Sequence, residues 1–286
     1  MKIAIASGKG GTGKTTVATN LAHVAARNGQ SVAYLDCDVE EPNGRIFLKP
    51  EITHREPVSI LVPQIDEAKC TLCGKCAEIC QYNAIAFLGK KVLVFPELCH
   101  SCGGCSLVCS DGAITEVPRE VGLLETGRAG PIWFVQGTLN IGEAKSPPVI
   151  RAVKAAAPEV NLAIIDAPPG TSCPVIESLR GCNSVVLVTE PTPFGLNDLK
   201  LAVEMVRALE VPFAVVINCA GIGDLAVQEY CSREGIKVLA EIRDDRRIAE
   251  AYSRGELVCE ALPEYAALFD NLLKAAGAEA ILLAGR

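Results

Sequence analysis

The sequence lacks any long, uninterrupted apolar stretch. Hydrophobic residues make up 49% of its 286 residues, yet the apolar runs are short and are broken by glycine, proline or charge. None reaches the roughly 18 residues that span a bilayer, so we expect no membrane insertion. The chain begins directly with a predicted strand and a glycine-rich loop, which predicts that no signal peptide is present. Together these features predict a cytoplasmic protein.

The sequence is also short of positive charge. Its 27 lysines and arginines are outnumbered by 34 aspartates and glutamates, giving a net charge of −7, and no basic stripe is present. Because nonspecific nucleic-acid binding depends on neutralising phosphates with lysine and arginine, nucleic acid is not an expected partner. The length fits one large domain or two smaller ones, with enough residues to bury a core.

Short apolar segments alternate with helical patterns along most of the chain. The segments are rich in Val and Ile, as in strands buried on both faces of a sheet, and span residues 3–6, 31–35, 132–135, 162–165, 184–188, 214–217 and 238–242. Helices are predicted at residues 15–26, 197–209, 225–233, 247–254 and 265–275. This alternation indicates an α/β fold with a doubly wound, mostly parallel sheet, whose ligands bind beyond the carboxyl ends of the strands.

A glycine-rich loop lies between the first predicted strand and the first predicted helix. It has the spacing of a phosphate-binding loop (P-loop), in which backbone N–H groups turn inward to cradle phosphates. The strand before it and the helix after it disfavour a purely structural glycine-rich turn. Lys14 is expected to reach the β- and γ-phosphates of ATP or ADP, and the Thr15 hydroxyl to ligate Mg²⁺. The predicted phosphate-binding residues are Gly8, Lys9, Gly10, Gly11, Thr12, Gly13, Lys14, Thr15 and Thr16.

The loop carries a further lysine, Lys9, that an ordinary P-loop does not have. The run from Lys9 to Thr16 resembles the deviant Walker A motif of the MinD/ParA/Mrp superfamily of ATPases, which includes the nitrogenase iron protein. The resemblance implies that Lys9 contacts phosphates across a nucleotide-sandwich dimer. We therefore expect an ATP-dependent homodimer, or a heterodimer with a related ATPase. A second cation at the γ-phosphate would stabilise transition-state charge, whereas the alternative is an exposed loop lysine without this role.

Two aspartate segments resemble the switches of that superfamily. Asp36-Cys37-Asp38 resembles switch I, which implies that Asp38 polarises the attacking water. The segment from Asp166 to Thr171 resembles the Walker B aspartate followed by switch II, which places Asp166 near Mg²⁺ and Gly170 near the γ-phosphate. The residues given catalytic roles by the resemblance are Lys9, Lys14, Asp38 and Asp166. The residues expected near Mg²⁺ are Thr15, Asp38 and Asp166.

Two later segments resemble the adenine pocket of the superfamily. Asn218, at the end of a predicted strand, matches the asparagine that reads the base edge. The segment from Ile242 to Asp245 matches the loop that packs over the base, and its predicted site residues are Arg243 and Asp244. An asparagine at a strand end is also commonly a capping residue, so this alternative stays open for Asn218.

Eight of the 14 cysteines fall in two runs of equal spacing, Cys70-x2-Cys73-x2-Cys76-x3-Cys80 and Cys99-x2-Cys102-x2-Cys105-x3-Cys109. In a cytosolic chain such cysteines favour metal binding over disulfides, and this spacing is that of bacterial ferredoxins. Zinc is the alternative, but its structural sites usually use two separated pairs of ligands. In two-cluster ferredoxins the fourth cysteine of each run ligates the other cluster. The predicted [4Fe–4S] ligand sets are therefore Cys70, Cys73, Cys76 and Cys109, and Cys80, Cys99, Cys102 and Cys105.

The cysteine runs interrupt the predicted nucleotide domain. We predict a discontinuous P-loop ATPase domain, resembling the nitrogenase iron protein, at residues 1–62 and 119–286. Residues 63–118 are predicted to form an inserted α+β ferredoxin-like domain with two [4Fe–4S] clusters. Proline usually follows such cysteine runs, whereas here Gln81 follows the first run and Ser110 the second. This difference does not remove any of the predicted cluster ligands. Cys173 matches a bridging cluster ligand of the nitrogenase iron protein, yet the second cysteine that bridging requires has no evident counterpart.

The expected function is that of an ATPase that hydrolyses Mg-ATP and gates electron transfer to a redox partner protein. One alternative is an ATPase that assembles or carries Fe–S clusters or another metallocofactor. Another is a positioning ATPase whose clusters sense redox state. No Cys-x2-Cys occurs in the C-terminal half, unlike the cluster-carrier ATPases of the superfamily, which favours the electron-transfer hypothesis.

Overall fold

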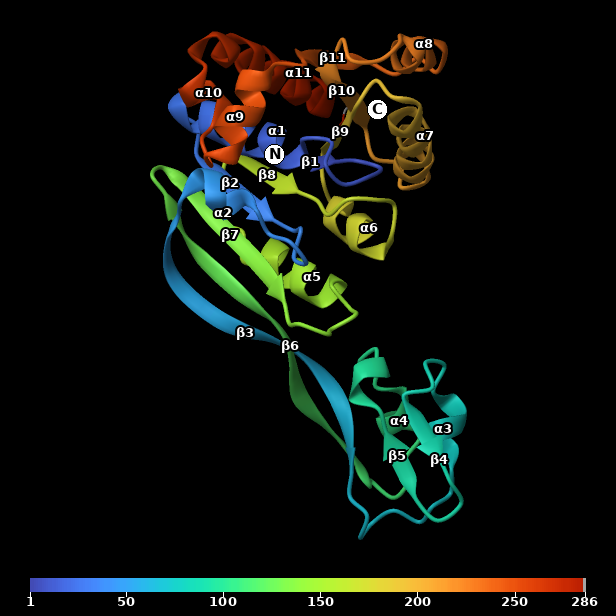
Figure 1. The fold of residues 1–286 in the computed structure, drawn as a ribbon. Coiled ribbons are helices and arrows are strands. Elements are labelled where there is room, and N and C mark those ends of the chain that lie inside the picture. Colours follow the sequence, from blue (N-terminus) through green and yellow to red (C-terminus); the bar gives the residue numbers. More distant parts are fainter. Residues whose placement is uncertain (285–286) are drawn as a thin grey trace.

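A single large twisted sheet organises the computed structural model, which describes residues 1–284 (Figure 1). Its nine strands run in the order β11-β10-β9-β1-β8-β2-β7-β6-β3. All neighbours from β11 to β7 are parallel, whereas β6 and β3 are antiparallel additions at the edge. The predicted α/β fold with a mostly parallel sheet is confirmed.

The elements follow the predicted alternation closely. The strands are β1 (Lys2–Ala6), β2 (Val32–Asp36), β3 (Glu51–Ile65), β4 (Ile85–Phe87), β5 (Val92–Val94), β6 (Ile114–Ala129), β7 (Ile132–Leu139), β8 (Leu162–Asp166), β9 (Ser184–Thr189), β10 (Phe213–Ala220) and β11 (Val238–Arg243). The helices are α1 (Lys14–Arg27), α2 (Gly44–Leu48), α3 (Lys75–Ile79), α4 (Gly104–Leu107), α5 (Pro147–Ala155), α6 (Cys173–Leu179), α7 (Pro193–Ala208), α8 (Ala226–Arg233), α9 (Arg246–Ser253), α10 (Val258–Ala261) and α11 (Ala266–Ala284). Two 3₁₀ turns are η1 (Pro96–Leu98) and η2 (Pro263–Tyr265).

Helices cover both faces of the sheet and create two apolar cores. On one face, side chains of α5, α6, α7 and α8 pack against the strands, with Val153, Leu179 and Val203 fully buried. On the other face, α1, α2, α10 and α11 do the same, with Leu21 and Phe269 fully buried. Because both faces are covered, the central strands can be apolar throughout, which is why their sequences show no alternation.

The edge strand β3 and its neighbour β6 form a long antiparallel ribbon that the sequence did not predict. Their pairing runs from Glu51–Arg128 to Ile65–Ile114, while β7 pairs with β6 only as far as Gly122. Residues 59–65 and 114–120 therefore project past β7 as a two-stranded arm, visible below the sheet in Figure 1. The predicted domain boundaries at 62/63 and 118/119 fall within this arm.

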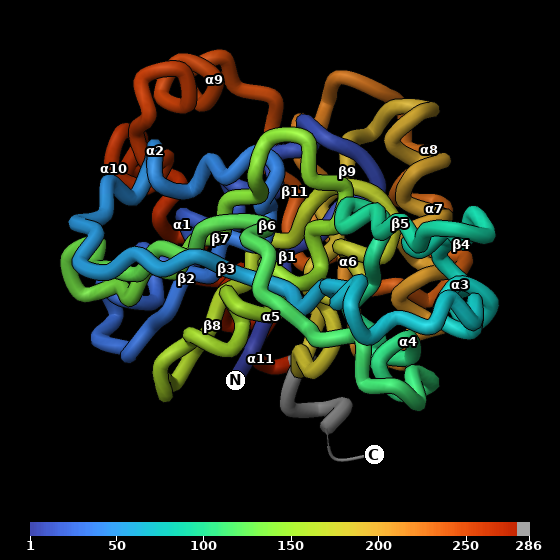
Figure 2. Tube along the Cα trace, turned by 90° about the horizontal axis from the view of Figure 1, so that it is seen from below, coloured from blue at the N-terminus to red at the C-terminus, as the bar shows by residue number. Residues whose placement is uncertain are grey.

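The arm carries a small lobe, residues 66–113, that contains both cysteine runs. We call it the cysteine lobe. It holds the hairpin β4–β5, the short helices α3 and α4, and η1. Figures 1 and 2 both place it on the α6 and α7 side of the sheet, away from α9 and α10. Its identity as a separate ferredoxin-like domain stays a prediction.

The two halves of the cysteine lobe repeat the same backbone. Residues 29 positions apart share a left-handed conformation: Leu72 and Ser101 have φ of 59° and 58°, and Gly74 and Gly103 have φ of 78° and 70°. A left-handed residue costs energy in ordinary L-amino acids, so its recurrence at matched positions reflects a common loop geometry. The two equally spaced cysteine runs of the sequence therefore also form a repeat in the structure.

No helix within residues 1–284 is both long and apolar enough to cross a membrane.

Candidate functional site

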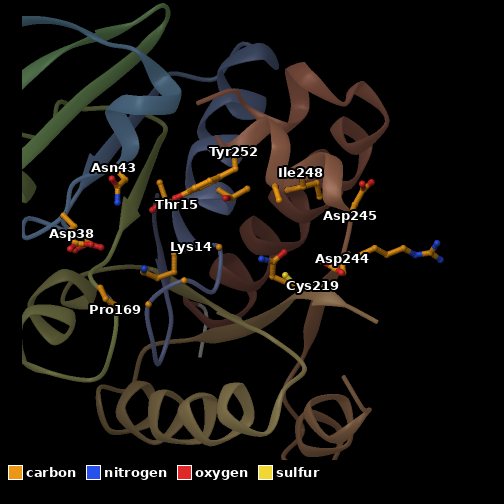
Figure 3. Close-up of a pocket in the computed structure, with 18 residues that line it drawn as sticks. Lys14, Thr15, Asp38, Asn43, Pro169, Cys219, Asp244, Asp245, Ile248 and Tyr252 are labelled. Atoms are coloured by element: carbon orange, nitrogen blue, oxygen red, sulfur yellow. The ribbon is translucent and has the colours of Figure 1, made fainter. Parts of the chain in front are cut away.

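A cavity lined by most of the predicted nucleotide-site residues, which we call the main cavity, lies beyond the carboxyl ends of the parallel strands, between the P-loop and α9 (Figure 3). Its volume is about 420 Å³. Most of the predicted nucleotide-site residues line it, namely Gly10, Gly11, Gly13, Lys14, Thr15, Thr16, Asp38, Asn218, Arg243 and Asp244. Five others, Gly8, Lys9, Thr12, Asp166 and Gly170, lie outside its lining.

The P-loop conformation depends on glycine at the start of α1. Gly13 has a φ of 91°, and a Cβ atom there would come within 2.4 Å of the Asn218 amide nitrogen. The same amide donates a hydrogen bond to the Thr12 carbonyl (3.0 Å). Asn218 thus holds the loop from β10 while it lines the cavity, and its predicted contact with a base edge stays a prediction. The Thr12 hydroxyl is buried without a hydrogen-bond partner.

Three aspartates meet at the ends of β2 and β8, next to Lys14. Asp36 is fully buried and accepts hydrogen bonds from the backbone N–H groups of Asp38 (3.2 Å) and Gly44 (2.9 Å). These two hydrogen bonds hold together the ends of the loop from which Asp38 faces the cavity. Burial raises the pKa of Asp36 well above its usual range, and the nearby charge of Asp166 adds to the shift.

Asp166 and Asp38 flank the place where a cation is predicted. Asp166 Oδ2 accepts a hydrogen bond from the Tyr34 hydroxyl (2.8 Å), whereas its Oδ1 is buried without a partner. Burial raises the pKa of Asp166, and it raises that of Asp38 to about 6, while the Lys14 ammonium opposes both shifts. A buried carboxylate oxygen without a hydrogen-bond partner, near a second carboxylate, fits a Mg²⁺ site, because a divalent cation would offset the cost of burying these charges.

Lys9 is held by its own chain. Its ammonium lies 2.9 Å from Glu190 Oε2, in the turn between β9 and α7. Both side chains are partly buried, with 33% and 19% of their surface exposed. This ion pair could not be predicted from the sequence, because the two residues are far apart in the chain and meet only where β1 and β9 are adjacent.

Residues that were not predicted from the sequence form the far end of the cavity. Ile248 and Tyr252 extend over it from α9, opposite Cys219 (Figure 3). Asp245 is the N-cap of α9. Its side chain accepts hydrogen bonds from the Arg247 backbone N–H (2.9 Å) and from the Tyr265 hydroxyl (2.8 Å), which hold the start of the helix in place. The aromatic ring of Tyr252 and the aliphatic side chain of Ile248 suit the flat face of a base, while the polar P-loop end of the cavity suits phosphates. The other lining residues that were not predicted are Glu41, Asn43 and Ala249, whereas Pro169 belongs to the predicted switch II segment.

The cysteine lobe contains two further cavities, each bordered by four cysteines. One is bordered by Cys70, Cys73, Cys76 and Cys109 and the other by Cys80, Cys99, Cys102 and Cys105. These are the crossed sets that the ferredoxin spacing predicts. No thiol of the lobe is in a disulfide. We call these groups the first and the second cysteine set.

Backbone N–H groups point at sulfur atoms in both cysteine sets. The Ala113 N–H donates to Cys109 Sγ (3.3 Å), and the Ser101 N–H donates to Cys99 Sγ (3.4 Å). Such bonds stabilise thiolate charge, as a thiolate-bound Fe–S cluster requires. Beside the second set, Tyr82 and His100 stack with ring centroids 3.7 Å apart. Four thiols at each cavity, with a backbone N–H donor at one sulfur of each set, are the kinds of group that ligate Fe–S clusters.

Comparison with known proteins bears on the nucleotide cavity. Uncharacterized protein MJ0579 of Methanocaldococcus jannaschii is 32% identical over 265 residues, which cover 90% of each chain. An iron-sulfur cluster carrier protein of Pyrococcus horikoshii is 26% identical over 280 residues, or 89% of this chain and 77% of that protein. The solved structure of septum site-determining protein MinD with Mg-ADP, also from Pyrococcus horikoshii, shares the fold with a TM-score of 0.57. Its sequence identity is 19%, over 96% of this chain and 93% of that one.

The family assignment rests on the greater part of the chain. Residues 3–258 match the family described as the CobQ/CobB/MinD/ParA nucleotide binding domain. That span includes every residue that lines the main cavity, from the P-loop to α9. It includes the cysteine lobe as well, although the family description does not account for the lobe's cysteines. The chain, with its nucleotide-sized cavity at the carboxyl edge of a parallel sheet, belongs to the CobQ/CobB/MinD/ParA nucleotide-binding family.

Proposed function

We propose that the protein is a Mg-ATP-hydrolysing ATPase that binds two [4Fe–4S] clusters and uses nucleotide binding to gate electron transfer to a partner protein. The observation that carries the proposal is the sorting of eight cysteines into two crossed sets, on an arm that leaves the nucleotide-binding sheet. Two independent sites in one folded unit favour coupled functions. We place ATP in the main cavity, with its phosphates at the P-loop and its base beside α9.

The nucleotide chemistry follows from the charges around the P-loop. Lys14 would bind the β- and γ-phosphates, and Thr15 and Asp166 would hold Mg²⁺. Asp38 would orient the attacking water from the loop after β2. Mg²⁺ supplies charge neutralisation at the phosphate oxygens. Lys9 would add positive charge at the γ-phosphate once it has exchanged its Glu190 partner for phosphate in an ATP-bound dimer.

The cysteine sets supply the second activity. When a [4Fe–4S] cluster is bound at each set, it provides one-electron redox chemistry. The chain contributes four thiolates per set and backbone N–H groups that stabilise their charge. Because the lobe is joined to the sheet by the β3–β6 arm, a movement near Asp38 can alter the exposure of the sets without breaking the fold.

Redox titration tests the gating proposal directly. The holoprotein would be titrated anaerobically with and without Mg-ATP, as wild type and as Lys14→Ala. We expect Mg-ATP to shift a cluster potential or the electron-transfer rate to an acceptor in wild type only. If neither the cluster potentials nor the electron-transfer rate of the wild type changes with nucleotide, gating is contradicted, even if ATP is hydrolysed.

A second candidate function is delivery of Fe–S clusters to other proteins. It is favoured by the relatives named iron-sulfur cluster carrier protein, which match about nine-tenths of this chain. The two candidates predict different fates for the iron. A carrier transfers iron to an apo-protein and is left empty, whereas an electron-transfer protein keeps its clusters through repeated redox cycles.

Removing Glu190 should strengthen ATP-dependent dimerisation. In Glu190→Gln the Lys9 ammonium loses its partner at 2.9 Å and becomes available for phosphate. A partly exposed ion pair contributes up to about 1 kcal/mol, so the dimer dissociation constant with Mg-ATP should fall by up to about fivefold. Analytical ultracentrifugation would measure it, with Glu204→Gln on α7 as a control for the loss of one carboxylate. An unchanged or weaker dimer would show that Glu190 does not compete for Lys9.

A further inference from the structure

The loop at residues 140–146, between β7 and α5, contacts the segment that follows Asp38 at both of its ends. At its start, the Leu139 N–H donates to the Val39 carbonyl (2.8 Å), one residue after Asp38. At its end, the Ser146 hydroxyl lies 3.4 Å from Glu40 Oε1. The segment that presents Asp38 to the cavity therefore cannot shift far without moving this loop.

The same loop braces the arm through a nearly buried ion-pair cluster. Glu143 has only 4% of its side chain exposed, and its Oε2 lies 2.6 Å from Arg119 Nη2 on β6. Glu143 Oε1 lies 3.7 Å from the Lys145 ammonium, and the Asn140 N–H donates to the Val121 carbonyl (3.0 Å). Removing one partner from such a cluster would leave a buried charge uncompensated, so the cluster favours one defined position of the loop.

Lys145 reaches from this cluster into the cysteine lobe. Its ammonium donates a hydrogen bond to the backbone carbonyl of Glu97 in η1, two residues before Cys99. The Lys145 side chain is 15% exposed, whereas Glu97 is an exposed residue at the surface of the lobe. Figure 1 shows the loop below α5 lying next to the upper end of the lobe. The contact is thus made beside the second cysteine set.

The two cysteine sets lie at different positions along the arm. The cavity of the second set is lined by Pro63 and Glu116 of the arm. The cavity of the first set is lined by Ile65 and Ile114, the last paired residues of the arm, and so lies farther along it. A displacement of Lys145 acts first on the segment that leads into Cys99.

We propose that Lys145 is a positioning residue that couples nucleotide-dependent movement of the Asp38 loop to the second cysteine set. The inference rests on the proposed function, because it requires that nucleotide binds at the P-loop. The Asp38 loop moves the 140–146 loop through Val39 and Glu40, and the Glu143 cluster keeps Lys145 aligned. The Lys145 ammonium then transmits the movement to the Glu97 carbonyl.

Hydrogen–deuterium exchange of the holoprotein tests this coupling without relying on activity. Exchange would be measured anaerobically with and without Mg²⁺ and a non-hydrolysable ATP analogue. In wild type we expect protection of residues 8–16 together with a change at residues 96–105. Lys145→Met should keep the protection at 8–16 and lose the change at 96–105, and Lys145→Arg should restore it. Lys91→Met removes a lobe lysine 3.9 Å from Glu67 and should behave as wild type.

The outcomes separate the coupling from the proposed function. If residues 8–16 are protected but 96–105 do not respond in wild type, or still respond in Lys145→Met, the coupling is wrong and nucleotide binding stands. If residues 8–16 are not protected, the proposed function fails as well. Should Lys145→Met fail to retain iron, Glu143→Gln, which weakens the anchor of Lys145 from outside the lobe, should reduce the response at 96–105. A full response in that variant would overturn the proposal.

Discussion

Cys109→Ala should lose one of the two Fe–S clusters and keep the other, and so should Cys80→Ala. Each variant should retain about four of the eight iron atoms that two [4Fe–4S] clusters contain. The expectation follows from the cavities, which group Cys109 with the first run and Cys80 with the second. Iron analysis and electron paramagnetic resonance of the reduced protein would measure the loss.

Double variants decide whether the ligand sets cross. Cys70→Ala with Cys109→Ala should lose no more iron than either single variant, because both residues serve one cluster. Cys70→Ala with Cys80→Ala should lose both clusters. The opposite pattern would show that each run binds its own cluster. Cys173→Ala is a matched control, since this exposed cysteine at the start of α6 lies outside the lobe. Loss of iron in that control would instead indicate a bridging cluster.

Lys14→Ala should lower kcat/KM for Mg-ATP hydrolysis by at least about 100-fold, the usual effect of removing one transition-state charge contact. Lys14 is nearly buried beside Asp38 and Asp166, so its loss leaves two carboxylates without their cation. Phosphate release measured over a range of ATP concentrations would test this. Lys200→Ala on α7, which removes a lysine outside the cavity, should leave hydrolysis unchanged.

Asp38 should also set the acid limb of the pH profile. Its pKa is raised to about 6 mainly by burial, and water polarisation requires the ionised form. The value of kcat/KM should therefore rise with pH through about 6, and Asp38→Asn should abolish that limb along with most of the activity. An acid limb that persists in Asp38→Asn would assign the titration to another group.

Local patterns predicted the nucleotide half of this protein well. The P-loop and the β-strands of the parallel sheet are each encoded by a short contiguous segment. The glycine spacing is typical of a P-loop, and the apolar runs are typical of buried strands. The β3–β6 ribbon escaped prediction because its strands contain Pro57, Pro63 and Pro118, which argue against a central strand. Proline is tolerated at β3 because β3 forms the sheet edge, and at Pro118 because β7 does not pair with that part of β6. Both positions are known only once the strand order is known.

The sequence by itself determined which chemical groups this chain carries: a P-loop, closely spaced aspartates and two cysteine runs of ferredoxin spacing. Tertiary structure alone decided how these parts meet. The wall formed by Ile248 and Tyr252, the Lys9–Glu190 pair and the Lys145–Glu97 contact each join residues distant in sequence. Such contacts leave no periodic or spacing signal, because they depend on which strands become neighbours and on where the arm carries the lobe.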